Sequence, residues 1–172
     1  MLILITGGAR SGKSSLAVRL AEERGGSQVT YIAPLVPQDE EMAERVRRHR
    51  ASRPAGWRTI EEPIDLRAAL AKAVADGSQA AIIDCLTLWL SNVMEQGWDE
   101  ERIIAEAETT ARAAQQSPST VIAVTNEVGG GIVPGNALAR RFRDVQGRVN
   151  QVWAAAGDEA LLMVAGLPVR LK

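Results

Sequence analysis

An apolar run, Leu2–Ile5, leads directly into a glycine-rich segment that ends in lysine and serine. Residues 7–14 read GGARSGKS, which fits the pattern G-x-x-x-x-G-K-[ST] that joins a strand to a helix around bound phosphates. Its glycines let backbone N–H groups turn toward the phosphates, and the helix that opens at Ser14 presents its positive end to them. In this pattern Lys13 meets the β- and γ-phosphate oxygens, and the Ser14 hydroxyl is placed to hold Mg²⁺. The sequence therefore predicts a nucleotide-binding loop with a strand before it and a helix after it.

Further along the chain, short apolar runs alternate with segments of helical periodicity. We expect strands at residues 2–6, 29–33, 57–61, 80–83, 120–124, 161–165 and 169–171. We expect helices at residues 14–24, 39–50, 64–76, 99–116 and 137–156, and one that starts near Leu86. Such alternation is typical of an α/β protein with a mostly parallel sheet and helices on both faces. With the phosphate-binding loop it predicts a P-loop NTPase-like (RecA-like) fold, formed by residues 1–172 as a single nucleotide-binding domain.

Several polar segments fall where predicted strands end. In open parallel sheets ligands bind beyond the carboxyl ends of the strands, so one edge should collect the phosphate-binding loop, Pro34-Leu35, Asp84 and Asn126-Glu127. Asp84 follows an apolar strand, as in a Walker B element, whose carboxylate holds Mg²⁺ directly or through water. The alternative is that Asp84 caps the helix expected just after it. Beside a phosphate-binding loop we favour the metal role.

The overall composition narrows the range of ligands and partners. The net charge is −1 and basic residues are interleaved with acidic ones, so there is no electrostatic footprint for nucleic acid. One histidine and one cysteine, Cys85, exclude an intrachain disulfide and a His/Cys zinc site within one chain. No apolar stretch approaches the roughly 18–20 residues that a membrane span needs. We therefore expect a cytoplasmic protein.

The single histidine, His49, allows two interpretations. Met42, Val46 and His49 fall at i, i+4 and i+7, which places the imidazole on the apolar stripe of its predicted helix and favours a packing role. The arginines around it favour the neutral imidazole that a nucleophile requires, and they would attract an anionic group. A solvent-exposed polar face explains the same arginines. The residues alone leave the role of His49 open.

Two features near the end of the chain are also ambiguous. The arginines of the late helix, at positions 140, 141, 143 and 148, form either a solvated face or a contact to a phosphate or a neighbouring subunit. The stretch 129–135, rich in glycine and proline, is either a loop that closes over substrate or a plain connection. We favour the solvated face for the arginines and leave the loop undecided.

Several segments together resemble one enzyme family. They are Thr6–Ser14 (TGGARSGKS), Arg48–Trp57 (RHRASRPAGW), Ile83–Asn92 (IDCLTLWLSN) and Val124–Pro134 (VTNEVGGGIVP), the last followed by Leu138–Gln151 (LARRFRDVQGRVNQ). In this order they are similar to the bifunctional adenosylcobinamide kinase / adenosylcobinamide-phosphate guanylyltransferase family of cobalamin biosynthesis. The likeness runs from Met1 to Lys172, and generic kinases do not carry the segment that begins at Val124.

The resemblance implies two successive reactions. The family uses ATP or GTP to phosphorylate the aminopropanol hydroxyl of adenosylcobinamide, then transfers GMP from GTP onto that phosphate and releases pyrophosphate. A histidine carries the GMP as a covalent intermediate, and His49 is the residue that matches it. The implied ligands are a nucleotide with Mg²⁺ and a corrinoid, and the implied assembly is a homotrimer with active sites near the subunit borders.

The resemblance also implies which residues form the nucleotide site. The phosphates would be bound by Gly8, Ala9, Arg10, Ser11, Gly12, Lys13, Ser14 and Ser15. The rest of the site would be lined by Ala33, Pro34, Leu35, Ala51, Ser52, Arg53, Pro54, Glu62 and Asp84. Lys13 would share catalysis with His49, and Ser14 and Asp84 would hold Mg²⁺.

Two other functions fit parts of the sequence. A plain P-loop small-molecule kinase would need the phosphate-binding loop and Asp84 but would make His49 dispensable. A GTP-switched regulatory protein would carry an N-K-x-D motif that reads guanine, and Asn126-Glu127 does not continue into that motif. The three functions differ in which phosphate of GTP is transferred to an acceptor. The transferred phosphate can be the α-phosphate, the γ-phosphate, or neither.

Overall fold

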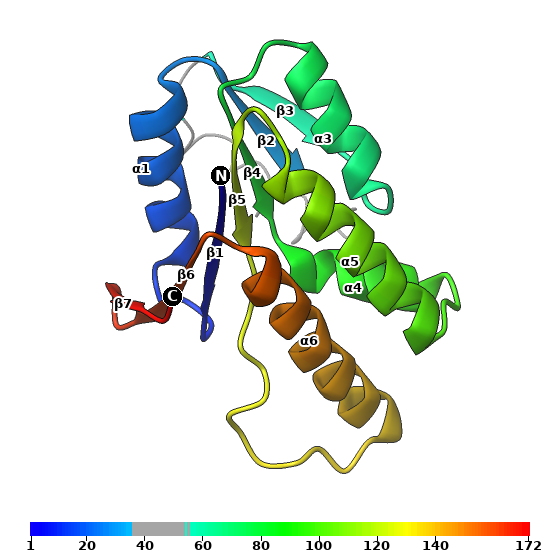
Figure 1. Ribbon diagram of the computed structural model, residues 1–172. Helices are drawn as coiled ribbons and strands as arrows, with labels where there is room; N and C mark the ends of the chain where they lie inside the picture. The colour runs from blue at the N-terminus through cyan, green and yellow to red at the C-terminus, as the bar shows by residue number, and fades with distance from the viewer. Residues whose placement is uncertain (36–53, 55) are drawn as a thin grey trace, which may run out of the picture.

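The computed structural model describes residues 1–35, 54 and 56–172. They form a seven-stranded sheet in the order β3-β2-β4-β5-β1-β6-β7, in which the neighbouring strands are parallel except for β6 and β7 (Figure 1). The strands are β1 (Leu2–Gly7), β2 (Val29–Ala33), β3 (Arg58–Glu61), β4 (Ala80–Asp84), β5 (Thr120–Val124), β6 (Glu159–Val164) and β7 (Leu167–Arg170). The predicted, mostly parallel sheet is thus confirmed.

Helices cover both faces of this sheet (Figure 1). They are α1 (Lys13–Gly25), α3 (Leu66–Ala75), α4 (Leu86–Glu95), α5 (Glu100–Gln115) and α6 (Ala137–Ala156). Helix α1 packs on one face, while α3, α4, α5 and α6 pack on the other. Within the described ranges, no helix is both long enough and apolar enough to cross a membrane.

The side chains of the central strand β1 alternate between these two layers. Leu2 and Leu4 join the core beneath α3–α6, whereas Ile3 and Ile5 join the core beneath α1. None of these four side chains is more than 1% exposed, so β1 is buried on both faces, as expected for the middle of a parallel sheet. The strand that leads into the phosphate-binding loop is therefore firmly held.

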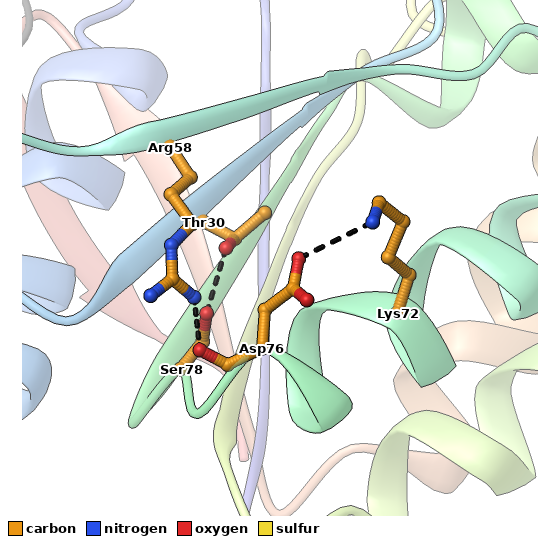
Figure 2. A network of polar contacts seen from close by, with 5 residues as sticks. All are labelled: Thr30, Arg58, Lys72, Asp76 and Ser78. Atoms are coloured by element: carbon orange, nitrogen blue, oxygen red, sulfur yellow. Dashed lines mark hydrogen bonds and ion pairs between the residues drawn. The ribbon is translucent and has the colours of Figure 1, made fainter.

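A polar network ties together the amino ends of β2, β3 and β4, at the edge of the sheet away from the phosphate-binding loop (Figure 2). The hydroxyls of Thr30 and Ser78 share a hydrogen bond of 2.7 Å. Arg58 donates to the backbone carbonyl of Asp76, whose carboxylate pairs with Lys72 at 3.4 Å. This network is remote from the carboxyl ends of the strands, where ligands bind in such sheets.

The predicted elements agree closely with those of the structure. β5 and α6 have the predicted bounds. Helix α3 begins at Leu66 and not at Ile64, because Asp65 is its N-cap and accepts a hydrogen bond from the Ala68 N–H at 2.9 Å. Strand β6 begins earlier than expected, at Glu159, because its pairing with β1 starts there. The helix predicted at residues 39–50 lies outside the described residues.

Candidate nucleotide site

The phosphate-binding loop joins β1 to α1 in a conformation that depends on its glycines. Gly7 has a φ of 144° and Gly12 has a φ of 97°, a range that residues other than glycine rarely adopt. A Cβ atom at Gly7 would also lie 2.6 Å from the backbone oxygen of Met163 in β6. Gly12 is the N-cap of α1, which begins at Lys13, so the positive end of the helix opens onto the loop. This is the arrangement in which helix N-termini bind phosphate groups.

Lys13 is buried at the start of α1, with 8% of its surface exposed. Its Nζ donates a hydrogen bond to the Gly8 carbonyl oxygen at 2.6 Å, which holds the ammonium against the loop. Burial lowers the pKa of Lys13, and the nearby Cys85 and Asp84 act in the opposite direction. A poorly hydrated cation interacts strongly with an anion, because little water screens it. Lys13 is therefore well suited to bind phosphate oxygens.

A cavity of about 650 Å³ opens at the carboxyl edge of the sheet. Its wall combines the phosphate-binding loop with the ends of β2, β3, β4 and β5 and the first turns of α4. It is lined by Ala9, Arg10, Ser11, Gly12, Lys13, Ser14, Ser15, Tyr31, Ala33, Leu35, Glu61, Asp84, Cys85, Leu88, Val124 and Asn126. Small-molecule and cofactor sites typically measure about 300–1,000 Å³, so a nucleotide fits this space.

Asp84 ends β4 on the wall of this cavity. The Tyr31 hydroxyl, from the neighbouring strand β2, donates to Asp84 Oδ2 at 2.6 Å. The N-cap residue of α4 is Cys85, without a side-chain cap bond, so the capping role considered for Asp84 is not observed. Burial first, and then the charge of Asp84, raise the pKa of Cys85 to about 11. The thiol beside Asp84 is therefore protonated and neutral at neutral pH.

Ser14 and Asp84, the predicted metal residues, both line the cavity. Among the described residues, no three or more His, Cys, Asp and Glu side chains gather into a metal centre. Mg²⁺ in nucleotide sites needs few protein ligands, because phosphate oxygens and water complete its coordination. One hydroxyl and one carboxylate on the same wall fit that requirement.

The end of β2 contributes the predicted segment 33–35 to the cavity. Ala33 and Leu35 line it. Pro34, which lies between them, is buried, and its carbonyl oxygen accepts a hydrogen bond from Asn92 Nδ2 at 2.6 Å. Pro34 therefore supports this wall through its backbone while its neighbours face the cavity.

Glu62 follows β3 but does not line the cavity. Its Oε1 accepts hydrogen bonds from the backbone N–H groups of Ile64 and Asp65, both at 2.9 Å, just ahead of α3. The neighbouring Glu61 lines the cavity instead. A contact between Glu62 and a nucleotide stays a prediction.

Not all of the other predicted residues can be placed. His49, Ala51, Ser52 and Arg53 lie outside the described residues. Pro54 is described and half-buried, and it does not line the cavity. Gly8 does not line it either, but its carbonyl oxygen holds Lys13.

The cavity wall includes residues to which the sequence patterns assign no role. Tyr31 lies inside a strand, and no pattern signals that its hydroxyl reaches Asp84. Leu88 and Cys85 belong to the start of α4 and look like core residues in the sequence. Asn126 is the exception, because Asn126-Glu127 was predicted to lie at the edge where ligands bind, and Asn126 does line the cavity.

The arginines of α6 bind backbone carbonyls and an acidic side chain of this chain. Arg143 donates to the Gly129 carbonyl at 2.6 Å, and Arg140 donates to those of Pro134 and Gly135 at 2.9 and 2.6 Å. Arg141 donates to the Trp98 carbonyl at 3.1 Å, and Arg148 pairs with Glu100. Two of these arginines thus hold the two ends of the glycine-rich loop, whose tip leaves Ile132 97% exposed. Arg140, Arg141 and Arg148 are exposed, as the favoured solvated face predicts, but neither alternative drawn from the sequence included the bonds to the loop.

Solved structures of low sequence identity share the fold. The flagellar accessory protein FlaH from Methanocaldococcus jannaschii matches with a TM-score of 0.51 and 16% identity, over 99% of this chain and 77% of that one. A KaiC-like protein, PH0186, from Pyrococcus horikoshii matches with a TM-score of 0.50 and 14% identity, over 94% and 69%. An ATPase domain matches with a TM-score of 0.51 and 11% identity, over 94% and 68%. These matches confirm the P-loop, RecA-like fold.

Closer relatives cover the whole chain. The bifunctional adenosylcobalamin biosynthesis protein CobP of Pseudomonas aeruginosa is 45% identical, over 98% of this chain and 96% of its own length. The bifunctional adenosylcobalamin biosynthesis proteins CobU of Escherichia coli and Salmonella typhimurium are each 43% identical, over 100% of both chains. The model of the family described as "Cobinamide kinase / cobinamide phosphate guanyltransferase" matches residues 3–171. Because this model spans residues 3–171 and the relatives are 43–45% identical over nearly the whole chain, the chain belongs to the cobinamide kinase / cobinamide phosphate guanyltransferase family.

Proposed function

We propose that this chain phosphorylates the aminopropanol hydroxyl of adenosylcobinamide with ATP or GTP, and then transfers GMP from GTP to the resulting phosphate. The products are adenosylcobinamide-GDP and pyrophosphate. The observation that carries the proposal is a cavity with Lys13, Ser14 and Asp84 on its wall, in a chain that matches the family over residues 3–171. Both reactions start from a nucleoside triphosphate, so one cavity serves both.

In the kinase reaction the substrate hydroxyl attacks the γ-phosphorus, the bond from that phosphorus to the bridging oxygen breaks, and the nucleoside diphosphate leaves while the hydroxyl proton passes to solvent. Lys13 and the N–H groups at the start of α1 bind the phosphate oxygens and stabilise the charge that develops on them. Ser14 and Asp84 would hold Mg²⁺, which when bound neutralises charge on the phosphates. Phosphoryl transfer depends mainly on such positioning and charge stabilisation, so these residues suffice for the protein's part.

In the guanylyl reaction the His49 imidazole attacks the α-phosphorus, and the bond between the α- and β-phosphates breaks. GMP is then joined to His49 through a phosphorus–nitrogen bond, and pyrophosphate leaves. The phosphate of adenosylcobinamide phosphate next attacks the same phosphorus, which breaks that bond and returns the neutral imidazole. Two observations support His49 in this role: it is the chain's one histidine, and it lies in the segment Arg48–Trp57, which resembles the family.

A homotrimer in the cytoplasm is the remaining part of the proposal. The resemblance to the family supports the trimer, and Ile132, Val133 and Leu138 offer apolar surface for subunit contacts, at 97%, 63% and 64% exposed. Sedimentation equilibrium should give three times the chain mass of 18.4 kDa, and a monomer mass would contradict the trimer.

Labelled GTP tests the histidine intermediate. Purified protein is incubated with Mg²⁺ and GTP that carries ³²P at the α or at the γ position, and is then denatured. We expect protein-bound label from the α position only, stable in alkali and lost in acid, as a phosphorus–nitrogen bond is. His49→Asn, which keeps a polar side chain of similar size, should take up no label.

The controls separate the proposed function from a plain kinase. His49→Asn must still bind GTP, so that absence of label reports chemistry and not unfolding. A wild-type protein that binds GTP and transfers its γ-phosphate without ever taking α label would be a plain kinase. In that case His49 would have a packing role.

A further inference from the structure

Asn126 lies two residues beyond the end of β5, and side chains bond both of its backbone polar groups. Its N–H donates to Thr87 Oγ1 at 3.0 Å, in the first turn of α4. Its carbonyl oxygen accepts a hydrogen bond from Asn150 Nδ2 of α6, also at 3.0 Å. Two helices that are far apart in the sequence therefore hold the backbone of this one residue.

A buried network fixes the orientation of the Asn150 amide. Asn150 Oδ1 accepts hydrogen bonds from the Thr125 hydroxyl at 2.7 Å and from Gln146 Nε2 at 2.8 Å. Gln146 Nε2 uses its other hydrogen on Thr125 Oγ1 at 3.1 Å. With the amide turned the other way, Oδ1 would face the Asn126 carbonyl oxygen, and two acceptors would repel each other. Because Asn150 is only 8% exposed, water can hardly replace its bond to Asn126.

The side chain of Asn126 is left available for a ligand. It lines the cavity, and its amide has no hydrogen bond within the part of the chain that the structure describes. Strand β5 lies between β1, which leads into the phosphate-binding loop, and β4, which ends at Asp84. Neighbouring strands are about 4.8 Å apart, so Asn126 lies close to both the loop and Asp84. The Glu127 N–H donates to the Gly7 carbonyl at 3.1 Å and joins this segment to the loop.

We propose that Asn150 and Thr87 are positioning residues that direct the Asn126 amide toward the terminal phosphate of the bound nucleoside triphosphate. That phosphate would lie between the loop and a metal ion at Asp84, where the amide can donate to its oxygens. The inference rests on the proposed function, because it assumes that both reactions start from a triphosphate in this cavity. Without the two bonds the backbone of Asn126 can rotate, and the triphosphate loses a contact that a diphosphate does not make.

Calorimetry with Mg²⁺ tests the inference through the affinities for two guanine nucleotides, a triphosphate and a diphosphate. Both carry a methylene group between the α- and β-phosphates, so no GMP is transferred during the titration. Asn126→Ala should weaken triphosphate binding about 10-fold, as loss of one hydrogen bond to a charged group does, and diphosphate binding less than about twofold. Asn150→Ala and Thr87→Val should each weaken triphosphate binding about 3- to 10-fold, again with little effect on the diphosphate.

A double variant shows whether Asn150 acts through Asn126. With Asn126→Ala already in place, Asn150→Ala should change the triphosphate affinity by less than about twofold more, because the contact that it supports is gone. A general loosening of the fold would instead add its own loss and would weaken both nucleotides. Urea unfolding shows that each variant is folded, and Thr87→Val, at a half-buried position, carries the test if Asn150→Ala does not fold.

Ser119→Ala is the matched control. The buried Ser119 hydroxyl donates to the Ser78 carbonyl at 2.6 Å, just ahead of β5 at the amino edge of the sheet. Its loss removes a buried bond to a backbone carbonyl without touching the cavity wall. Both affinities should therefore stay within about twofold of those of the wild type.

The outcomes separate the inference from the proposed function. Equal losses of the two affinities, wild-type affinities in folded Asn150→Ala and Thr87→Val, or additive losses in the double variant overturn the inference. Transfer of γ-³²P from GTP to adenosylcobinamide by the wild type is measured alongside. If the wild type transfers none, the proposed function fails, whereas the affinities still decide the inference. A selective loss of triphosphate affinity that does not add to that of Asn126→Ala supports Asn150 and Thr87 as positioning residues.

Discussion

Gly7→Ala should be among the most damaging small substitutions in this protein. The added Cβ would lie 2.6 Å from the Met163 backbone oxygen, a distance that real Cβ contacts essentially never show, and 3.0 Å from Ser11 Oγ, which is tighter than most Cβ contacts. The φ of 144° adds strain, because alanine strongly disfavours that conformation. Strain and overpacking each cost about 1–3 kcal/mol, so we expect the free energy of unfolding to fall by about 2–6 kcal/mol. That is a large share of the roughly 5–15 kcal/mol typical of a folded domain.

Gly8→Ala is the control for this prediction. No atom lies within 4 Å of a Cβ at Gly8, which is exposed, so its unfolding free energy should change by less than about 0.5 kcal/mol. Urea unfolding of both variants gives the comparison, and titration with GTP shows whether the loop of Gly7→Ala still binds nucleotide. Equal unfolding midpoints for the two variants would refute the close packing of Gly7 against β6.

Three further predictions concern the cavity. Asn126 lines the cavity just after β5, the strand between β1 and β4, and we expect its side chain to contact the terminal phosphate of GTP. Measured by calorimetry, Asn126→Ala should therefore weaken GTP binding about 10-fold and GDP binding less. Equal losses of GTP and GDP affinity would contradict this contact. The pKa of Cys85, raised to about 11, predicts that at about pH 8 iodoacetamide alkylates Cys85 far more slowly in the folded protein than in the unfolded chain. The alkylation rate of the folded protein should rise as the pH approaches that pKa. Equal rates for the folded and unfolded protein would contradict the raised pKa. EDTA should stop both α and γ transfer and Mg²⁺ should restore them, whereas transfer that persists in EDTA would argue against the metal role of Ser14 and Asp84.

Much of the fold was predictable because local patterns determined it. The apolar run 120–124 and the periodic segment 137–156 are a strand and a helix with those bounds. The element ends that moved did so for tertiary reasons, such as the pairing of Glu159 with Ile3 that extends β6. The strand order was not predicted either, because periodicity carries no information about which strands become neighbours.

At the site, too, features with a local sequence pattern could be predicted, whereas contacts between distant residues could not. The phosphate-binding loop was found because its residues follow a fixed local spacing, and Asp84 was found because it directly follows an apolar strand. The bond from Tyr31 to Asp84 and the bonds of Asn92 join residues far apart in the sequence, and nothing local predicts them. The arginines of α6 are visible in the sequence as a charged helix face, but their partners are not. Nothing in the sequence indicates that Arg143 donates to the Gly129 carbonyl.

The assignment of both reactions to one cavity is tested most directly with Lys13→Met and His49→Asn. Transfer from the α and from the γ position of labelled GTP to the corrinoid is measured with Mg²⁺, using adenosylcobinamide for the γ position and adenosylcobinamide phosphate for the α position. We predict that Lys13→Met loses both transfers and that His49→Asn loses only the α transfer. Full α transfer by a Lys13→Met protein that unfolds at the wild-type midpoint would contradict a shared nucleotide cavity.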